Sequence, residues 1–136
     1  MNSYKRASLR NLAAFGAAAA LPSIGVAASV YPSRTVSIVV PYPAGGLSDI
    51  IARNVNAALG KHLGQPVIVE NIGGGSGSIA ATKVLTAQSD GYQVFQGSPN
   101  ELILAPLAIS AIKFKSEDFR LVQMIATAQI AFLCRA

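Results

Sequence analysis

The sequence predicts an α/β protein in which a parallel β-sheet is flanked by helices. Two observations carry this prediction. Short apolar runs alternate along the chain with amphipathic stretches, in the order strand, helix, strand, helix, strand. Each run also ends in a turn rich in proline, glycine or serine. Hydrophobic residues make up 51% of the 136 residues and charged residues only 12%, a composition that excludes a disordered protein.

The first strand, turn and helix form the most informative segment. Val36–Val40 is a β-branched run typical of a parallel strand covered on both faces. The turn Pro41–Gly46 ends this strand, because proline cannot continue it and glycine lets the backbone turn tightly. We expect Ser48 or Asp49 to cap the amphipathic helix that follows, and Gly64 to end it.

The remaining elements are expected to continue the alternation and to give three parallel strands. We predict a strand at Pro66–Glu70, a glycine-rich loop at Asn71–Ser78, a helix from there to about Gln88, a strand at Tyr92–Gly97, a short helix at Leu102–Ile109 that ends near Pro106, an irregular connector at Lys113–Phe119, and strand-like runs at Leu121–Ala126 and Ile130–Cys134.

Residues 1–28 have the pattern of a secretory signal peptide. Lys5, Arg6 and Arg10 precede an apolar stretch, and small residues near Ala28 offer a cleavage site. Three of the 11 basic residues lie in this leader, so 8 remain against 6 acidic residues. The basic balance of the whole chain is therefore partly a targeting signal, and no nucleic-acid partner is expected.

The three loops that follow the strands are expected to meet at one edge of the sheet, since right-handed crossovers place them there. These loops are Tyr42–Asp49, Asn71–Ser78 and Ser98–Glu101. The first ends at a helix N-terminus, whose unpaired backbone N–H groups attract anions. A carboxylate or phosphate ligand is the natural expectation.

Two other kinds of site find less support. Gly75–Ala80 matches the dinucleotide pattern G-x-G-x-x-A, but the next strand ends in Gln96 and Gly97, where an acidic residue should bind the ribose. A nucleotide-binding α/β domain therefore remains a minor alternative. Asp49 and Glu101 could form a carboxylate pair, yet the chain has only one histidine and no nucleophile elbow in a suitable context. No enzyme activity, cofactor or metal is expected, since the one histidine and the one cysteine lie far apart.

Three motifs resemble the extracytoplasmic solute receptors of tripartite tricarboxylate transporters, the Bug family. They are VVPYPAGGLSDIIAR at Val39–Arg53, LGQPVIVENIGGGSGSIA at Leu63–Ala80, and SDGYQVFQGSP at Ser89–Pro99. The resemblance implies a periplasmic-binding-protein-like fold of type II, with two α/β lobes that clamp a ligand. Family members are more than twice this long. The resemblance therefore implies that residues 29–136 are the N-terminal part of lobe 1, ending near the crossover to lobe 2.

The family resemblance also implies a function. It implies a periplasmic receptor that binds a small carboxylate (a dicarboxylate, tricarboxylate, acidic amino acid or aromatic acid) and delivers it to the membrane components of a tripartite tricarboxylate transporter. We expect a monomer. The alternative is a truncated fragment that binds nothing, because a cleft with one wall loses most of its contact area. The expected ligand-binding residues are Tyr42, Ala44, Gly45, Gly46, Ser48, Asp49, Gly77, Ser78, Ser98, Asn100 and Glu101.

Two positions qualify this expectation. Many members have an Arg-Pro pair where this chain has Ile72-Gly73, so a more flexible second loop is expected. Glu101, if it faces the cleft, would disfavour a second ligand carboxylate and favour an amine or hydroxyl.

Overall fold

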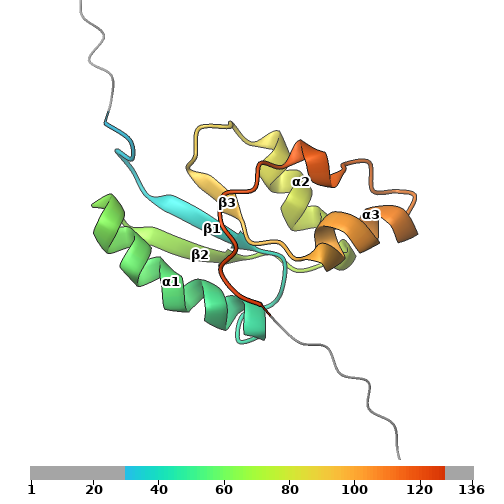
Figure 1. The fold of residues 1–136 in the computed structure, drawn as a ribbon, viewed down its shortest axis with the longest axis horizontal. Helices are drawn as coiled ribbons and strands as arrows, with labels where there is room; N and C mark the ends of the chain where they lie inside the picture. The colour runs from blue at the N-terminus through green and yellow to red at the C-terminus, as the bar shows by residue number, and fades with distance from the viewer. Residues whose placement is uncertain (1–29, 128–136) are drawn as a thin grey trace, which may run out of the picture.

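The computed structural model describes residues 30–127 and shows a three-stranded parallel sheet with helices on both faces (Figure 1). The strands are β1 (Val36–Val40), β2 (Val67–Asn71) and β3 (Gln93–Phe95), in the spatial order β2-β1-β3. This confirms the predicted α/β class. The predicted signal peptide and the run Ile130–Cys134 lie outside the described residues.

The helices follow the predicted order. They are α1 (Leu47–Leu63), the 3₁₀ turn η2 (Gly75–Gly77), α2 (Ser78–Thr86), the π-helical turn η3 (Asn100–Leu104), α3 (Ala105–Ala108) and the 3₁₀ turn η4 (Ser116–Asp118). α1 ends as predicted, because Gly64 adopts the left-handed conformation (φ 69°) that glycine accepts without strain.

The pleat of β1 sends alternate side chains to two different layers. Val36, Ile38 and Val40 are buried with Ala52 of α1 on one face of the sheet. On the other face, Ser37 and Lys83 of α2 both hydrogen-bond Glu70 of β2. Figure 1 accordingly shows α1 and α2 on opposite sides of the sheet. The strand at the centre is therefore covered on both faces, as its continuous apolar sequence predicts.

The hydrogen-bonded ladder runs on past the ends of the strands at their carboxyl edge. Ile72 N–H donates to the Val40 carbonyl at 2.8 Å, and Gln96 N–H donates to the Val39 carbonyl at 2.9 Å. The three loops that follow the strands therefore start side by side. This arrangement is what positions the candidate site.

The predicted N-terminal cap of α1, Ser48 or Asp49, is wrong. The helix begins at Leu47, and the residue at its cap is Gly46, which has no side chain to bond the first turn. The extended conformation of Gly46 (φ −79°, ψ 172°) starts the helix two residues earlier than a cap at Ser48 and three residues earlier than a cap at Asp49.

Two predictions for the second half of the described chain are also wrong. Leu121–Ala126 forms no strand, because its exposed backbone finds no neighbouring strand to pair with among the described residues. Pro106 does not end the short helix but lies in the first turn of α3, where its missing N–H costs no hydrogen bond.

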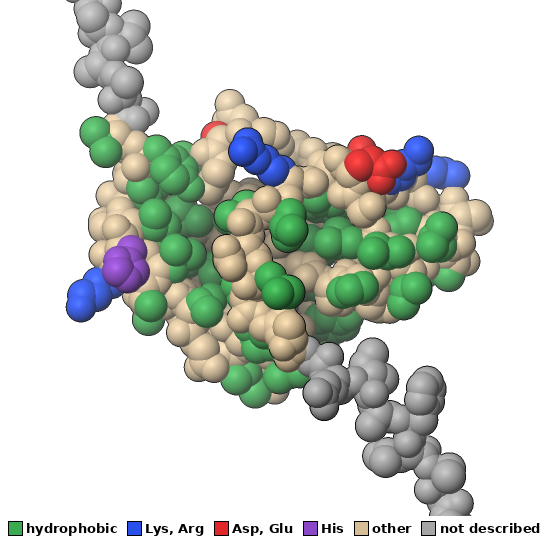
Figure 2. Space-filling view, in the orientation of Figure 1, with side chains coloured by type: hydrophobic (Ala, Val, Ile, Leu, Met, Phe, Trp, Pro, Cys, Tyr) green, Lys and Arg blue, Asp and Glu red, His purple; other side chains and the backbone are tan. Residues whose placement is uncertain are grey.

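Large apolar side chains are exposed over much of the surface, and on the face in Figure 2 they spread across the molecule with charged groups mainly at its margins. Those on the second half of the chain include Leu107, Leu121 and Val122, which are 81%, 85% and 79% exposed. Among residues 30–127, none of the helices has the length and apolar character needed to cross a membrane.

Candidate functional site

The three loops meet at the carboxyl edge of the sheet, as predicted. Gly77 packs so closely on the third loop that a Cβ atom built on it would lie 2.3 Å from Cγ of Glu101 and 3.2 Å from Cβ of Pro41. Gly73 likewise approaches Pro43, with 3.4 Å between its ideal Cβ position and the proline Cδ. The first, second and third loops are thus in direct contact.

Glu101 is the centre of this contact. Its side chain is fully buried (0% exposed), so it does not face an open cleft. One carboxylate oxygen, Oε2, accepts hydrogen bonds from the Ser98 backbone N–H at 2.6 Å and from the Ser98 hydroxyl at 2.7 Å. The other, Oε1, accepts from the Tyr42 hydroxyl and from Asn100 Nδ2. The carboxylate therefore ties the first loop to the third.

The hydrogen bonds keep Glu101 ionised although it is buried. Burial alone raises the pKa of this carboxyl, but the hydrogen bonds donated by Tyr42, Ser98 and Asn100 outweigh burial and the net shift is downward. The same contact raises the pKa of Tyr42, chiefly because its hydroxyl proton is bonded to Glu101. The proton of this pair consequently stays on the tyrosine.

Asp49 holds the first loop from inside. It is only 3% exposed, and its Oδ2 accepts hydrogen bonds from the Gly45 backbone N–H at 2.8 Å and from Arg53 Nε at 2.9 Å. These two bonds, with Arg53 the larger cause, lower the pKa of Asp49 to about 2. Asp49 does not pair with Glu101, because the two carboxylates have separate hydrogen-bond partners.

Two residues that we did not predict complete this arrangement. Asn71, at the end of β2, donates from Nδ2 to the Tyr42 carbonyl at 3.1 Å and accepts from Arg53 at 3.3 Å. Gln96, just after β3, donates to the Ser48 carbonyl at 2.8 Å. The spacing of Asp49 and Arg53, four residues apart on one helix face, is a signal that indicates their ion pair from the sequence. The contacts of Asn71 and Gln96 span loops, so no local pattern indicates them.

The N-terminus of α1 opens at this edge of the sheet. Only the Gly45 N–H of this turn is shown bonded to a side chain, and the first N–H groups of a helix have no partner within the helix. Ala44, Gly46 and Ser48 line this N-terminus, with Ser78 at the start of α2. The arrangement offers backbone donors to an anion, with the partial positive charge of a helix N-terminus behind them.

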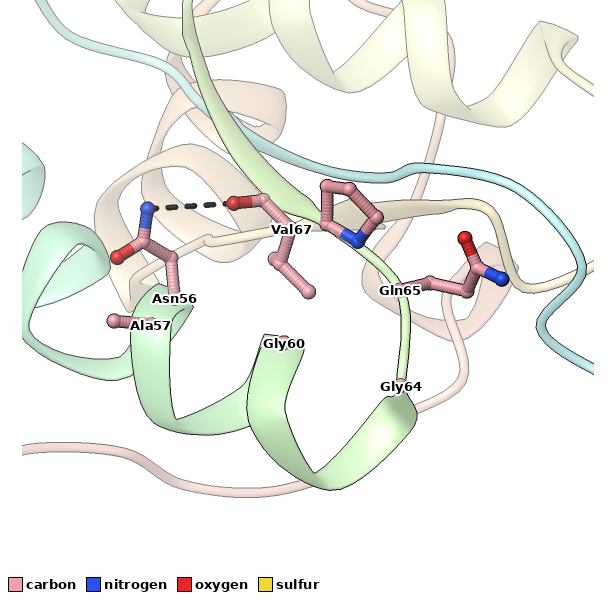
Figure 3. Close-up of a pocket in the computed structure, with 7 residues that line it drawn as sticks. Asn56, Ala57, Gly60, Gly64, Gln65 and Val67 are labelled. Carbon is pink, nitrogen blue, oxygen red and sulfur yellow. Dashed lines mark hydrogen bonds between the residues drawn. The ribbon is translucent and has the colours of Figure 1, made fainter.

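Two hollows of the described part of the protein lie away from the three loops. One, of about 390 Å³, lies between the end of α1 and the start of β2, on the opposite edge of the sheet (Figure 3). There Asn56 points to the Val67 carbonyl, and Gly60 and Gly64 line the hollow (Figure 3). The other, of about 430 Å³, lies between α3 and residues 112–117. Neither of these hollows includes a residue of the three loops that form the loop cluster.

No group of three or more histidine, cysteine, aspartate or glutamate side chains within residues 30–127 is arranged to hold a metal ion. The acidic side chains of the loop cluster are instead engaged by backbone, hydroxyl, amide and guanidinium donors. A loop cluster of this kind can bind a small polar solute.

Comparison with known proteins identifies the family. A family model described as the tripartite tricarboxylate transporter family receptor matches residues 51–136. The chain belongs to this receptor family. This confirms the resemblance of the three sequence motifs, and the family is one of receptors for transporters.

The chain is also similar to individual proteins. It is 37% identical to a UPF0065 protein from the ttuE–ttuC′ intergenic region of Agrobacterium vitis, over 93% of this chain and 36% of that protein. It is 34% identical to protein BugT of Bordetella pertussis, over 72% of this chain and 29% of that protein. A solved structure, MatC from Rhodopseudomonas palustris with bound malate, is 45% identical over 48% of this chain and 22% of that one, with a TM-score of 0.47. The chain thus spans about a third of the length of these curated relatives.

Proposed function

We propose that this chain is the part of a periplasmic solute receptor that binds one carboxylate group of a small organic acid. The observation that carries the proposal is the N-terminus of α1, which has no side-chain cap and opens where three loops meet. Membership of the tricarboxylate transporter receptor family supports it independently.

The backbone groups of the first turn fit a carboxylate. The N–H groups of Leu47 and Ser48 start the helix, and a carboxylate oxygen is a good acceptor for such donors. Asp49 lies in the same turn, but its charge is compensated by Arg53 and by the Gly45 N–H. In this proposal Asp49 shapes the turn, and the solute contacts the backbone on either side of Gly46.

The loop after β3 and the glycine-rich loop form the rest of the proposed site. Ser98 and Asn100 are exposed and present polar groups next to Tyr42. They are bordered by Gly77, the last residue of η2, and by Ser78, the first residue of α2. Because neither hollow includes these loops, we propose that the remaining contacts to a solute come from a further part of the receptor.

The finer biological role follows from the family. We propose that residues 1–28 direct the chain to the periplasm, and that the receptor delivers its solute to the membrane components of a tripartite tricarboxylate transporter. We propose binding without catalysis, because both buried carboxylates of the loop cluster accept hydrogen bonds that hold the loops in place.

A second candidate role is a chain that folds but does not bind a solute alone. The observation that favours it is the exposure of the apolar side chains of Leu107, Leu121 and Val122. A thermal melt of the chain with succinate or malate separates the two roles. A ligand that binds only the native state raises the midpoint, whereas an unchanged midpoint at millimolar ligand favours the second role.

The variant Gly46→Ala tests the location of the site. Its φ of −79° suits alanine, and the new Cβ would lie 3.6 Å from the Pro43 carbonyl oxygen, an ordinary contact. We therefore expect unchanged stability but about tenfold weaker carboxylate binding, since the methyl group stands before the backbone donors. Isothermal titration of the chain with malate measures this.

Gly60→Ala is the matched control for this variant. It adds the same methyl group at the opposite edge of the sheet and should leave the affinity unchanged. Equal affinity of the wild type and Gly46→Ala would contradict the proposed position of the carboxylate.

A further inference from the structure

The hydroxyl group of Tyr42 has a fixed hydrogen-bonding direction. We propose that buried Glu101 holds this hydroxyl as an acceptor toward the solute, so that the site prefers an organic acid that also carries a hydroxyl or ammonium donor. The inference rests on the proposed carboxylate site and specifies the chemistry of a second group on the same solute.

The contacts of Glu101 fix where the tyrosine proton lies. An ionised carboxylate only accepts hydrogen bonds, so the hydroxyl of Tyr42 must be the donor in their contact. The Ser98 N–H and hydroxyl occupy the other carboxylate oxygen at 2.6 and 2.7 Å. Because Glu101 is fully buried, water cannot replace the tyrosine as a donor.

A solute carboxylate therefore competes poorly for the Tyr42 proton. If the hydroxyl turned toward such a solute, Glu101 Oε1 would keep only Asn100 Nδ2, at 3.2 Å. A buried charge would then lose a charge-assisted hydrogen bond, which is among the most costly polar losses in a protein. The raised pKa of Tyr42 agrees with a proton that is firmly held.

The oxygen atom of the Tyr42 hydroxyl can still accept a further hydrogen bond. Asn100 Nδ2 donates to it at 3.3 Å, a long bond that leaves acceptor capacity on the oxygen. A hydroxyl or ammonium group of a solute can donate to this oxygen, whereas a second carboxylate would meet an acceptor. The charge of Glu101, which forms no ion pair within residues 30–127, adds to this preference.

Malate and succinate test the inference, because they differ by one hydroxyl group. Isothermal titration of the 136-residue chain should show that at least one malate enantiomer binds about fivefold more tightly than succinate, the typical worth of one neutral hydrogen bond. Tyr42→Phe should bring this ratio to about one, whatever its effect on the affinity for succinate. Tyr31→Phe is the control, since that hydroxyl bonds the distant Gly91 carbonyl, and it should keep the wild-type ratio.

The outcomes separate the two proposals. Binding of succinate with an equal affinity for malate, or a malate preference that survives in Tyr42→Phe, would overturn the inference and leave the carboxylate site intact. Binding of neither acid would overturn both. An NMR titration of ¹³Cζ-labelled tyrosine gives a ligand-free test, in which the pKa of Tyr42 should lie above the ordinary value of tyrosine and should fall in Glu101→Gln. A Tyr42 pKa at the ordinary tyrosine value would overturn the proton assignment.

Discussion

At the scale of single residues, two buried carboxylates shape the candidate site by accepting hydrogen bonds from its loops. Asp49 takes the N–H of Gly45 and the guanidinium of Arg53, and Glu101 takes groups from two loops. Carboxylates this buried are retained when several donors compensate their desolvation. The ordering of the loops therefore depends on both groups being ionised.

The pH dependence of stability should reveal the Asp49 contacts. Its pKa is about 2 in the folded protein and 3.8 in an ordinary carboxyl, so its stabilising effect is complete above about pH 4. As the pH falls from 4 toward 2, the unfolded chain takes up a proton before the folded chain does, and stability is lost. In Asp49→Asn this part of the loss should be absent, as urea unfolding between pH 2.5 and 6 would measure.

Glu101 also has a lowered pKa, so some acid destabilisation should remain in the Asp49→Asn variant. Identical pH profiles for the wild type and the variant would show that the Asp49 ion pair does not contribute to folding stability.

At the scale of elements, the site is made by the close approach of turns. η2 and the N-terminus of α2 reach η3 only because position 77 has no side chain and takes a left-handed conformation (φ 84°). Ser76 beside it also has a positive φ of 52°, which is uncommon for serine. The glycine-rich sequence of this loop therefore serves packing between loops.

Gly77→Ala should be strongly destabilising. The new Cβ would overlap Cγ of Glu101, and alanine disfavours the left-handed conformation. We expect a loss of about 2–5 kcal/mol in the free energy of unfolding, combining strain of 1–2 kcal/mol with overpacking of 1–3 kcal/mol. Gly46→Ala, with its negative φ, is the control and should change stability little. Chemical denaturation of both variants measures the difference, and similar midpoints would contradict the packing argument.

At the scale of the whole molecule, residues just before β1 fasten the start of the chain to the turn before β3. Arg34 forms an ion pair with Asp90 at 2.9 Å, and its guanidinium lies 3.9 Å from the centre of the Tyr92 ring. The Tyr92 hydroxyl also accepts a hydrogen bond from the Ser33 N–H at 2.8 Å. These contacts join segments almost 60 residues apart and fix the order of the strands from the amino edge of the sheet.

Arg34→Ala should lower the stability of the chain by about 1 kcal/mol, since an exposed cation–π contact and an exposed ion pair each contribute less than that. For a domain of this size the melting temperature should fall by about 4–8 °C. Arg120→Ala is the control, because Arg120 forms no hydrogen bond or ion pair with the described residues. Equal melting temperatures for the two variants would show that the N-terminal contacts do not stabilise the fold.

The sequence by itself determined the class and order of the fold. The continuous apolar run of β1 requires cover on both faces, and the positions of Pro41 and Gly64 mark where a strand stops and a helix ends. These are local steric and hydrophobic effects, so they can be read from neighbouring residues. The sequence also predicted that the three loops meet, because the handedness of the crossover connections is nearly invariant.

The tertiary structure decided which polar side chains hold the loops together. The sequence predicts Glu101 and Asp49 as ligand-binding residues, and the structure shows that both are buried and bonded to the loops. The partners of Asp49 lie four residues away, whereas the contact of Glu101 with Tyr42 joins two loops that are distant in the sequence. The tertiary structure also decided that Leu121–Ala126 is not a strand, since a strand needs a partner that its own sequence cannot supply. Hydrogen-bond partners across loops depend on three-dimensional proximity, and no periodicity of the chain encodes it.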